Sequence, residues 1–103
     1  MQFLLIAHDH TDDEALTRRM ATRTEHLARA EALAANGTAL FATAILNDEG
    51  QMVGSVMVFD FPSRAELDAS LAEEPYVTGK VWGTIDISPT RVGPAFAARL
   101  GLS

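Results

Sequence analysis

Residues 38–61 read TALFATAILNDEGQMVGSVMVFDF, two apolar runs separated by a polar turn. Between them the runs contain the valine, isoleucine and phenylalanine that favour strands. Residues 47–50, Asn-Asp-Glu-Gly, have the composition of a hairpin turn. We therefore predict two antiparallel strands, over residues 38–46 and 52–61, joined as a hairpin.

Strand and helix signals lie on both sides of this hairpin. Residues 3–7 are a short apolar run, typical of a strand that is buried on both faces. Residues 14–35 have a helical period and are followed by Asn-Gly, which ends a helix. Residues 63–73 begin with a Ser-x-x-Glu capping box and predict a second helix. Residues 81–88 alternate Val, Gly, Ile and Ile with Trp, Thr, Asp and Ser, which predicts a fourth strand.

The first predicted helix carries an apolar stripe that we expect to face the core. Its members recur at helical spacing and are Leu16, Met20, Leu27, Ala30 and Ala34. The charged residues of this helix, Arg18 and Arg19 among them, lie mainly off the stripe.

The order strand-helix-strand-strand-helix-strand predicts a ferredoxin-like α+β fold. In this arrangement a four-stranded antiparallel sheet carries both helices on one face. The other face would expose a large apolar patch, and a second copy packed sheet to sheet is its simplest cover. We therefore expect residues 1–103 to form one domain, which assembles as a homodimer.

Composition and charge exclude several classes of protein. Hydrophobic residues make up 48% and charged residues 21% of the 103 residues, a globular composition. No apolar run approaches the roughly 20 residues of a membrane-spanning helix. Fourteen acidic residues against eight basic ones give a net charge of −6, which argues against nucleic-acid and anionic membrane partners.

The chain contains no cysteine, which excludes disulfides and thiolate metal sites. This fits the reducing cytoplasm, where we place the protein. The apolar N-terminal run is short and lacks a preceding basic residue, so we interpret it as a strand rather than a signal peptide. No phosphate-binding loop, dinucleotide fingerprint or haem motif is visible, and we expect no organic cofactor.

Two sites carry residue types suited to acid/base chemistry. Arg23 and His26 are neighbours on the first helix, and a carboxylate could orient the histidine as a general acid or base. Glu73, Glu74 and Tyr76 flank the proline that ends the second helix, so one carboxylate could reach His26 and the tyrosine could supply a hydroxyl. The plainer alternatives are a histidine bonded to a backbone carbonyl or water, and a solvated Glu-Glu pair.

Three further features have both structural and functional interpretations. Ser55 follows Gly54 and could line a cavity, but no nucleophile-elbow motif surrounds it, so the glycine could equally mark a bulge. His8 and His10 would face one side of an extended segment and could bind a divalent metal adventitiously, but we favour a polar loop and predict no metal site. Trp82 could belong to the core or to a pocket wall.

Four pieces of the chain occur in the order that one known family shows. They are Arg23-x-x-His26-Leu27, Gly37 after the helix, Gly54-Ser55, and Glu74-Pro75-Tyr76-x-x-Gly79-x-Val81-Trp82 with Pro89 downstream. Together they resemble the YciI-like, or YCII-related, family over nearly the whole chain. The resemblance implies a dimeric α+β barrel built from ferredoxin-like subunits.

The resemblance also implies an active site built on a histidine and an aspartate. The family histidine corresponds to His26, and the aspartate of its Asp-Pro-Tyr motif corresponds to Glu74, which is one methylene longer. One relative removes chloride from a chlorinated hydroxyquinol, and related barrels include isomerases and small monooxygenases. On this basis Arg23 would hold an anionic substrate group, and Ser55 and Tyr76 would be polar pocket contacts.

Our first hypothesis is therefore a small cytoplasmic enzyme that uses acid/base chemistry on a small cyclic or aromatic compound. The reaction would be an isomerisation or an elimination such as dehydrochlorination, without metal or cofactor. A second hypothesis is a non-catalytic homodimer that binds a small ligand or acts as an accessory protein. A partner-binding module and a barrel-type monooxygenase remain as further alternatives.

Overall fold

The computed structural model describes residues 1–102 and contains the predicted order of strands and helices. The elements are β1 (Gln2–Asp9), α1 (Ala15–Ala35), β2 (Ala39–Leu46), β3 (Met52–Asp60), α2 (Arg64–Leu71), α3 (Pro75–Thr78), β4 (Trp82–Thr90), α4 (Pro94–Ala97) and a final 3₁₀ helix (Ala98–Leu100). The short helix α3 replaces the turn that we expected after the second helix. Among the helices of residues 1–102, none is long and apolar enough to cross a membrane.

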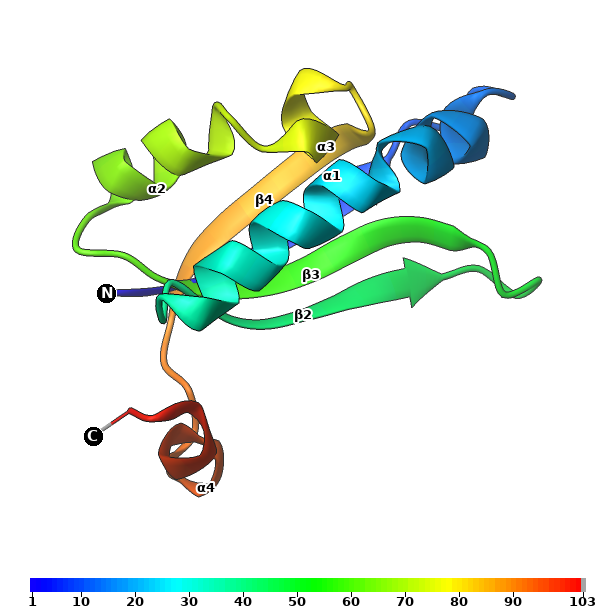
Figure 1. The fold of residues 1–103 in the computed structure, drawn as a ribbon. Helices are drawn as coiled ribbons and strands as arrows, with labels where there is room; N and C mark the ends of the chain where they lie inside the picture. The colour runs from blue at the N-terminus through cyan, green and yellow to red at the C-terminus, as the bar shows by residue number, and fades with distance from the viewer. Residues whose placement is uncertain (103) are drawn as a thin grey trace.

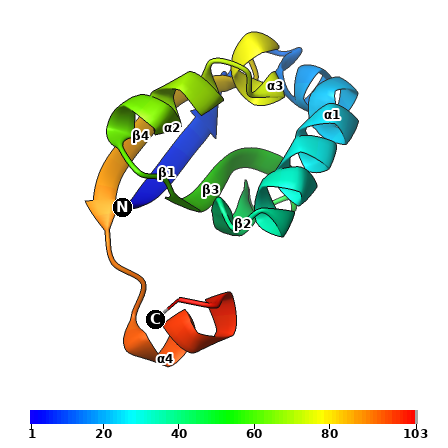
Figure 2. The same ribbon diagram turned by 60° about the vertical axis from the view of Figure 1, so that its left-hand side comes forward.

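The four strands form one sheet in the order β2-β3-β1-β4, and every neighbouring pair is antiparallel. Helices α1, α2 and α3 lie on one face of this sheet (Figure 1). In the second view the same three helices arch over the strands, whereas α4 lies apart from them beyond the end of β4 (Figure 2). The predicted ferredoxin-like α+β arrangement is confirmed.

The core lies between the sheet and the helices. Its members alternate along the strands and include Phe3 and Leu5 of β1, Met57 and Phe59 of β3, and Leu67 of α2. We expected β1 to be buried on both faces, but in the single chain only one face is buried. The side chains that alternate with the core residues are partly exposed, so within residues 1–102 the second face of the sheet stays largely open.

Helix α1 does not present the apolar stripe that its spacing predicted. Met20 and Leu27 are 49% and 44% exposed, whereas Arg19 and His26 are buried. That prediction is wrong because hydrophobic periodicity treats charged side chains as solvent-facing. Here each of the two inward polar side chains pairs with a buried carboxylate, which removes most of the cost of its burial.

The predicted alternation of β4 is also wrong at its start. Val81 and Trp82 are both buried, although they are adjacent in sequence. The register of β1 against β4 shifts between His8 and Asp9, so that Asp9 pairs with Trp82. This irregularity lets the indole turn towards the helices, where it contacts Ser55.

Gly54 marks a close approach between neighbouring strands rather than contact with a ligand. A Cβ atom at this position would lie 2.5 Å from the backbone oxygen of Ala7. Only glycine fits at that distance without backbone movement. Gly54 thereby fixes where the next residue, Ser55, lies relative to β1.

Candidate active site

His26 and Glu74 form a buried pair between α1 and α3. His26 Nδ1 lies 3.0 Å from Glu74 Oε2, and the two side chains are 9% and 5% exposed. Glu74 is also the N-cap of α3, because the same Oε2 accepts a hydrogen bond of 2.8 Å from the backbone N–H of Tyr76. Pro75 occupies the first position of α3, where its fixed φ angle favours the helix start. The cap therefore aims the carboxylate at the imidazole.

This geometry determines which nitrogen of a neutral His26 ring carries the proton. An ionised carboxylate can only accept hydrogen bonds, so Nδ1 must donate to Glu74. Nε2 then keeps its lone pair and is free to accept a proton from another molecule. The carboxylate also stabilises the positive charge that the ring gains on protonation. The pair is thus suited to general acid/base chemistry.

Aromatic side chains hold the His26 ring in place. Tyr76 stacks on it with a centroid distance of 3.9 Å and an interplanar angle of 8°, and Trp82 meets it edge-on at 6.1 Å. The guanidinium carbon of Arg19 lies 4.7 Å from the centroid of the Tyr76 ring. Burial raises the pKa of the Tyr76 hydroxyl, opposed by the charge of Arg19, so this phenol stays neutral near neutral pH.

A second buried ion pair lies beside the first. Arg19 Nη1 donates to both carboxylate oxygens of Asp9, at 2.8 and 3.1 Å. Arg19 Nη2 donates to Ser55 Oγ at 2.9 Å, and Trp82 Nε1 donates to the same oxygen at 3.2 Å. Burial raises the pKa of the Asp9 carboxyl, and the neighbouring guanidinium opposes this shift.

Sequence reasoning missed Arg19 and Asp9, although both left a signal. Arg19 stands seven residues before His26, two helical turns away, so the two side chains share one face of α1. Asp9 continues the alternation of Phe3 and Leu5 along β1 and therefore points to the helix side. When each of two adjoining elements carries a charged residue in a core position, a buried ion pair between them is expected.

A cavity of about 170 Å³ adjoins these residues, between α1 and strands β2 and β3. It is lined by Arg19, Arg23, His26, Ser55 and Tyr76, together with Thr43 and apolar residues. The structure thus brings together the five residues that we singled out, four at the cavity wall and Glu74 behind His26. Within residues 1–102, Arg23 has no ion-pair or hydrogen-bond partner, whereas the charge of Arg19 is balanced by Asp9.

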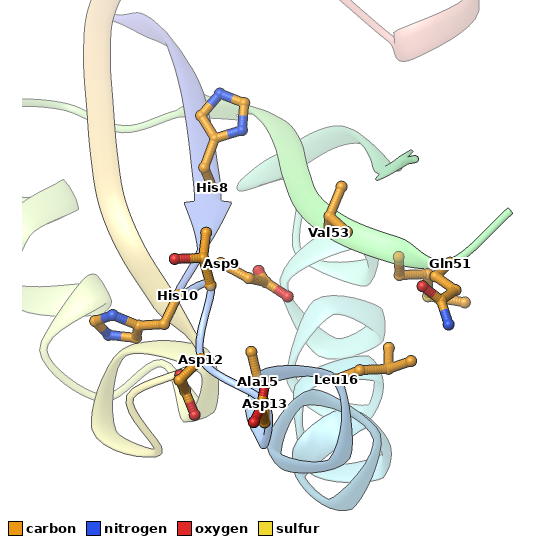
Figure 3. Close-up of a pocket in the computed structure, with 11 residues that line it drawn as sticks. His8, Asp9, His10, Asp12, Asp13, Ala15, Leu16, Gln51 and Val53 are labelled. Atoms are coloured by element: carbon orange, nitrogen blue, oxygen red, sulfur yellow. The ribbon is translucent and has the colours of Figure 1, made fainter. Parts of the chain in front are cut away.

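The histidines at the end of β1 lie in a separate and more open hollow. Its volume is about 590 Å³, and it lies between the end of β1, the start of α1 and the first residues of β3 (Figure 3). The rings of His8 and His10 point in different directions (Figure 3), because β1 ends at Asp9 and the alternation that we assumed does not extend to His10. In the described part of the chain, no three histidine, aspartate or glutamate side chains gather closely enough to hold a metal ion.

Comparison with solved structures shows the same fold in proteins of low sequence identity. A 5-chloro-2-hydroxyhydroquinone dehydrochlorinase, TftG from Burkholderia phenoliruptrix AC1100, solved with 2,5-dihydroxybenzoquinone, has a TM-score of 0.78 at 20% identity. The similarity covers 92% of this chain and 98% of that one. An antibiotic biosynthesis monooxygenase has a TM-score of 0.53 at 18% identity, over 89% of this chain and 99% of the other.

The family assignment comes from the sequence. A search of curated proteins found no match. The family model of the YCII-related domain, however, matches residues 1–91, which include all four strands and both ion pairs described above. The chain therefore belongs to the YCII-related family.

Proposed function

We propose that this protein is a small-molecule enzyme in which His26 and Glu74 act together as a general acid/base pair. The observation that carries the proposal is the 3.0 Å contact between a buried imidazole and a buried carboxylate at the wall of a cavity. A buried carboxylate that aims a histidine into a cavity is an arrangement suited to proton transfer. The structural similarity to a dehydrochlorinase supports elimination as the reaction class.

In such an elimination His26 Nε2 accepts a proton from the substrate. The electron pair of the bond that held this proton forms a new double bond. Chloride then leaves with the electrons of the carbon–chlorine bond. Glu74 stabilises the imidazolium until the proton is released to solvent or returned to another atom of the substrate, the latter being an isomerisation. No cofactor is required for either reaction.

The cavity favours a small substrate with a negatively charged group. Its volume of about 170 Å³ is well below that of sites for drug-sized ligands, which suits a single ring. Arg23 is half-buried and supplies a positive charge that no described carboxylate balances, so it is the group that would hold a phenolate or carboxylate. Tyr76 and Ser55 contribute polar contacts at the same wall.

We propose further that two copies of the chain pack through their open sheet faces. The cross-strand pairs Leu4–Val58 and Ile6–Val56 put apolar side chains on this face, and Phe41 beside Val58 is 57% exposed. A second copy would remove this surface from water. Light scattering during gel filtration tests the assembly, and Phe41→Asp should yield monomers.

The enzyme hypothesis is tested with a panel of chlorinated di- and trihydroxybenzenes, monitoring chloride release and ring-proton exchange in heavy water. We expect His26→Gln to lower turnover by a factor of about 10² to 10⁴ while ligand binding persists. His10→Gln, which changes an exposed histidine, is the matched control and should leave turnover unchanged.

Equal turnover in His26→Gln and wild type would sink the acid/base role. Binding of these compounds without turnover in the wild type would instead favour the non-catalytic ligand-binding homodimer. Consumption of oxygen during turnover would identify a barrel-type monooxygenase.

A further inference from the structure

Ser55 stands where two buried donors converge beside the cavity. Arg19 Nη2 donates to its hydroxyl oxygen at 2.9 Å, and Trp82 Nε1 donates to it at 3.2 Å. Neither a guanidinium nor an indole N–H can accept a hydrogen bond. A serine hydroxyl oxygen has two lone pairs, so these two bonds use its entire capacity as an acceptor.

The proton of the same hydroxyl has no acceptor among residues 1–102. Ser55 is only 3% exposed, so bulk water does not readily supply one. A buried donor without a partner costs free energy, and the cavity that Ser55 lines is the remaining direction for its proton. The cavity therefore contains one hydrogen-bond donor whose role is set by its neighbours.

We propose that Ser55 donates a hydrogen bond to an oxygen anion of the ligand, and that Arg19 and Trp82 hold it in this role. The inference rests on the proposed function only in placing the ligand in this cavity and does not require turnover. The positive charge of Arg19 draws electron density from the hydroxyl oxygen and makes it a stronger donor. Arg23 adds a second attraction for a negative oxygen at the same wall.

This assignment defines the ligand class and excludes other roles for Ser55. The site selects a single-ring phenolate or carboxylate over a neutral phenol, because the Ser55 hydroxyl proton and the positive charge of Arg23 both favour a negatively charged oxygen. An amine or ammonium group would find neither an acceptor on Ser55 nor a negative partner at Arg23. With both lone pairs occupied, the hydroxyl oxygen does not serve as a nucleophile or base.

The probe is 4-nitrophenol, because its phenolate is yellow and its neutral form nearly colourless. It is titrated with protein at a pH where both forms are present, and the wild type should increase the yellow fraction on binding. Ser55→Ala should weaken phenolate binding about tenfold or more, with little change for the neutral form. Thr24→Ala removes a hydroxyl from an exposed residue of α1 that does not line the cavity, so this matched control should leave the phenolate preference unchanged.

Two further variants test the inference even if Ser55→Ala does not fold. Ser55→Cys preserves the shape but offers only a weak donor, and it should also lose the phenolate preference. Trp82→Phe frees one lone pair of Ser55, so neutral 4-nitrophenol should gain affinity relative to the phenolate by several-fold. The inference is overturned if the wild type shows no phenolate preference, or if folded Ser55→Ala and Ser55→Cys proteins retain it. The preference could be lost in these variants while the wild type shows no turnover of the chlorinated di- and trihydroxybenzenes. That result would support the inference and contradict the proposed enzyme.

Discussion

The imidazole of His26 lies parallel to the phenol ring of Tyr76, 3.9 Å from it, while its Nδ1 edge contacts Glu74. The residue that stacks on the ring also donates its backbone N–H to the carboxylate that bonds the ring. The first turn of α3 therefore determines both the orientation of the imidazole plane and which ring nitrogen faces Glu74. Restricting the ring in this way favours a single geometry for the proton transfer that we propose.

The tautomer of His26 should depend on Glu74. In Glu74→Gln the amide can donate to Nδ1, so the neutral ring can carry its proton on Nε2 instead. Long-range ¹H–¹⁵N spectra of the three histidines should show the Nδ1–H form in wild type and a shift towards the Nε2–H form in the variant. Glu73→Gln, an exposed neighbour, should leave the spectrum of His26 unchanged. An identical His26 pattern in all three proteins would contradict the proposed pair.

Breaking the Arg19–Asp9 pair should be costly. Both side chains are nearly inaccessible, at 3% and 4% exposure, so Arg19→Met leaves a buried carboxylate without its partner. We expect a loss of about 3–5 kcal/mol in the free energy of unfolding, measured with urea. The double variant Arg19→Met/Asp9→Leu should recover much of it, because no buried charge remains. Failure of the double variant to improve on the single one would show that packing, not charge, dominates here.

The surface pair of Arg18 and Asp12 should stabilise the fold at neutral pH but not in acid. Its hydrogen bonds, led by the one from the Arg18 side chain, lower the pKa of the Asp12 carboxyl from 3.8 to about 2. Because the folded pKa is the lower one, the stabilisation is present above about pH 4 and disappears as the pH falls towards 2. Unfolding curves of wild type and Asp12→Asn should therefore differ at neutral pH and converge in acid. High salt should reduce the difference, since solvent and its ions reach both side chains, which are 30% and 51% exposed.

Two side-chain truncations test which residues of α1 and α2 face the core. Leu67 of α2 is fully buried, so Leu67→Ala should lower the free energy of unfolding by about 2–5 kcal/mol. Met20 of α1 belongs to the stripe that the sequence predicted as core but is 49% exposed. Met20→Ala should therefore change stability by well under 1 kcal/mol. A large loss at Met20 would mean that this side chain is covered in the assembled protein.

The sequence by itself determined the order of the four strands and of helices α1 and α2, and their bounds to within about two residues. Period-2 and period-3.6 patterns, the hairpin turn after Leu46 and the Ser63 cap are local properties, since each depends on residues within one or two turns of the chain. The choice of His26 and Glu74 as a pair also came from the sequence, helped by the family motif. Their separation of 48 residues meant that no spacing rule could give the contact itself.

Only the tertiary structure decided which face of α1 is inward and how the residues of the site are connected. Arg19 and Asp9 are buried because each neutralises the other across two elements, and a hydrophobic pattern contains no term for such a pair. The position of Trp82 follows from a register shift between β1 and β4, which neither strand shows alone. The donor role inferred for Ser55 depends on both neighbours, contributed by α1 and β4, so it exists only once the chain has folded.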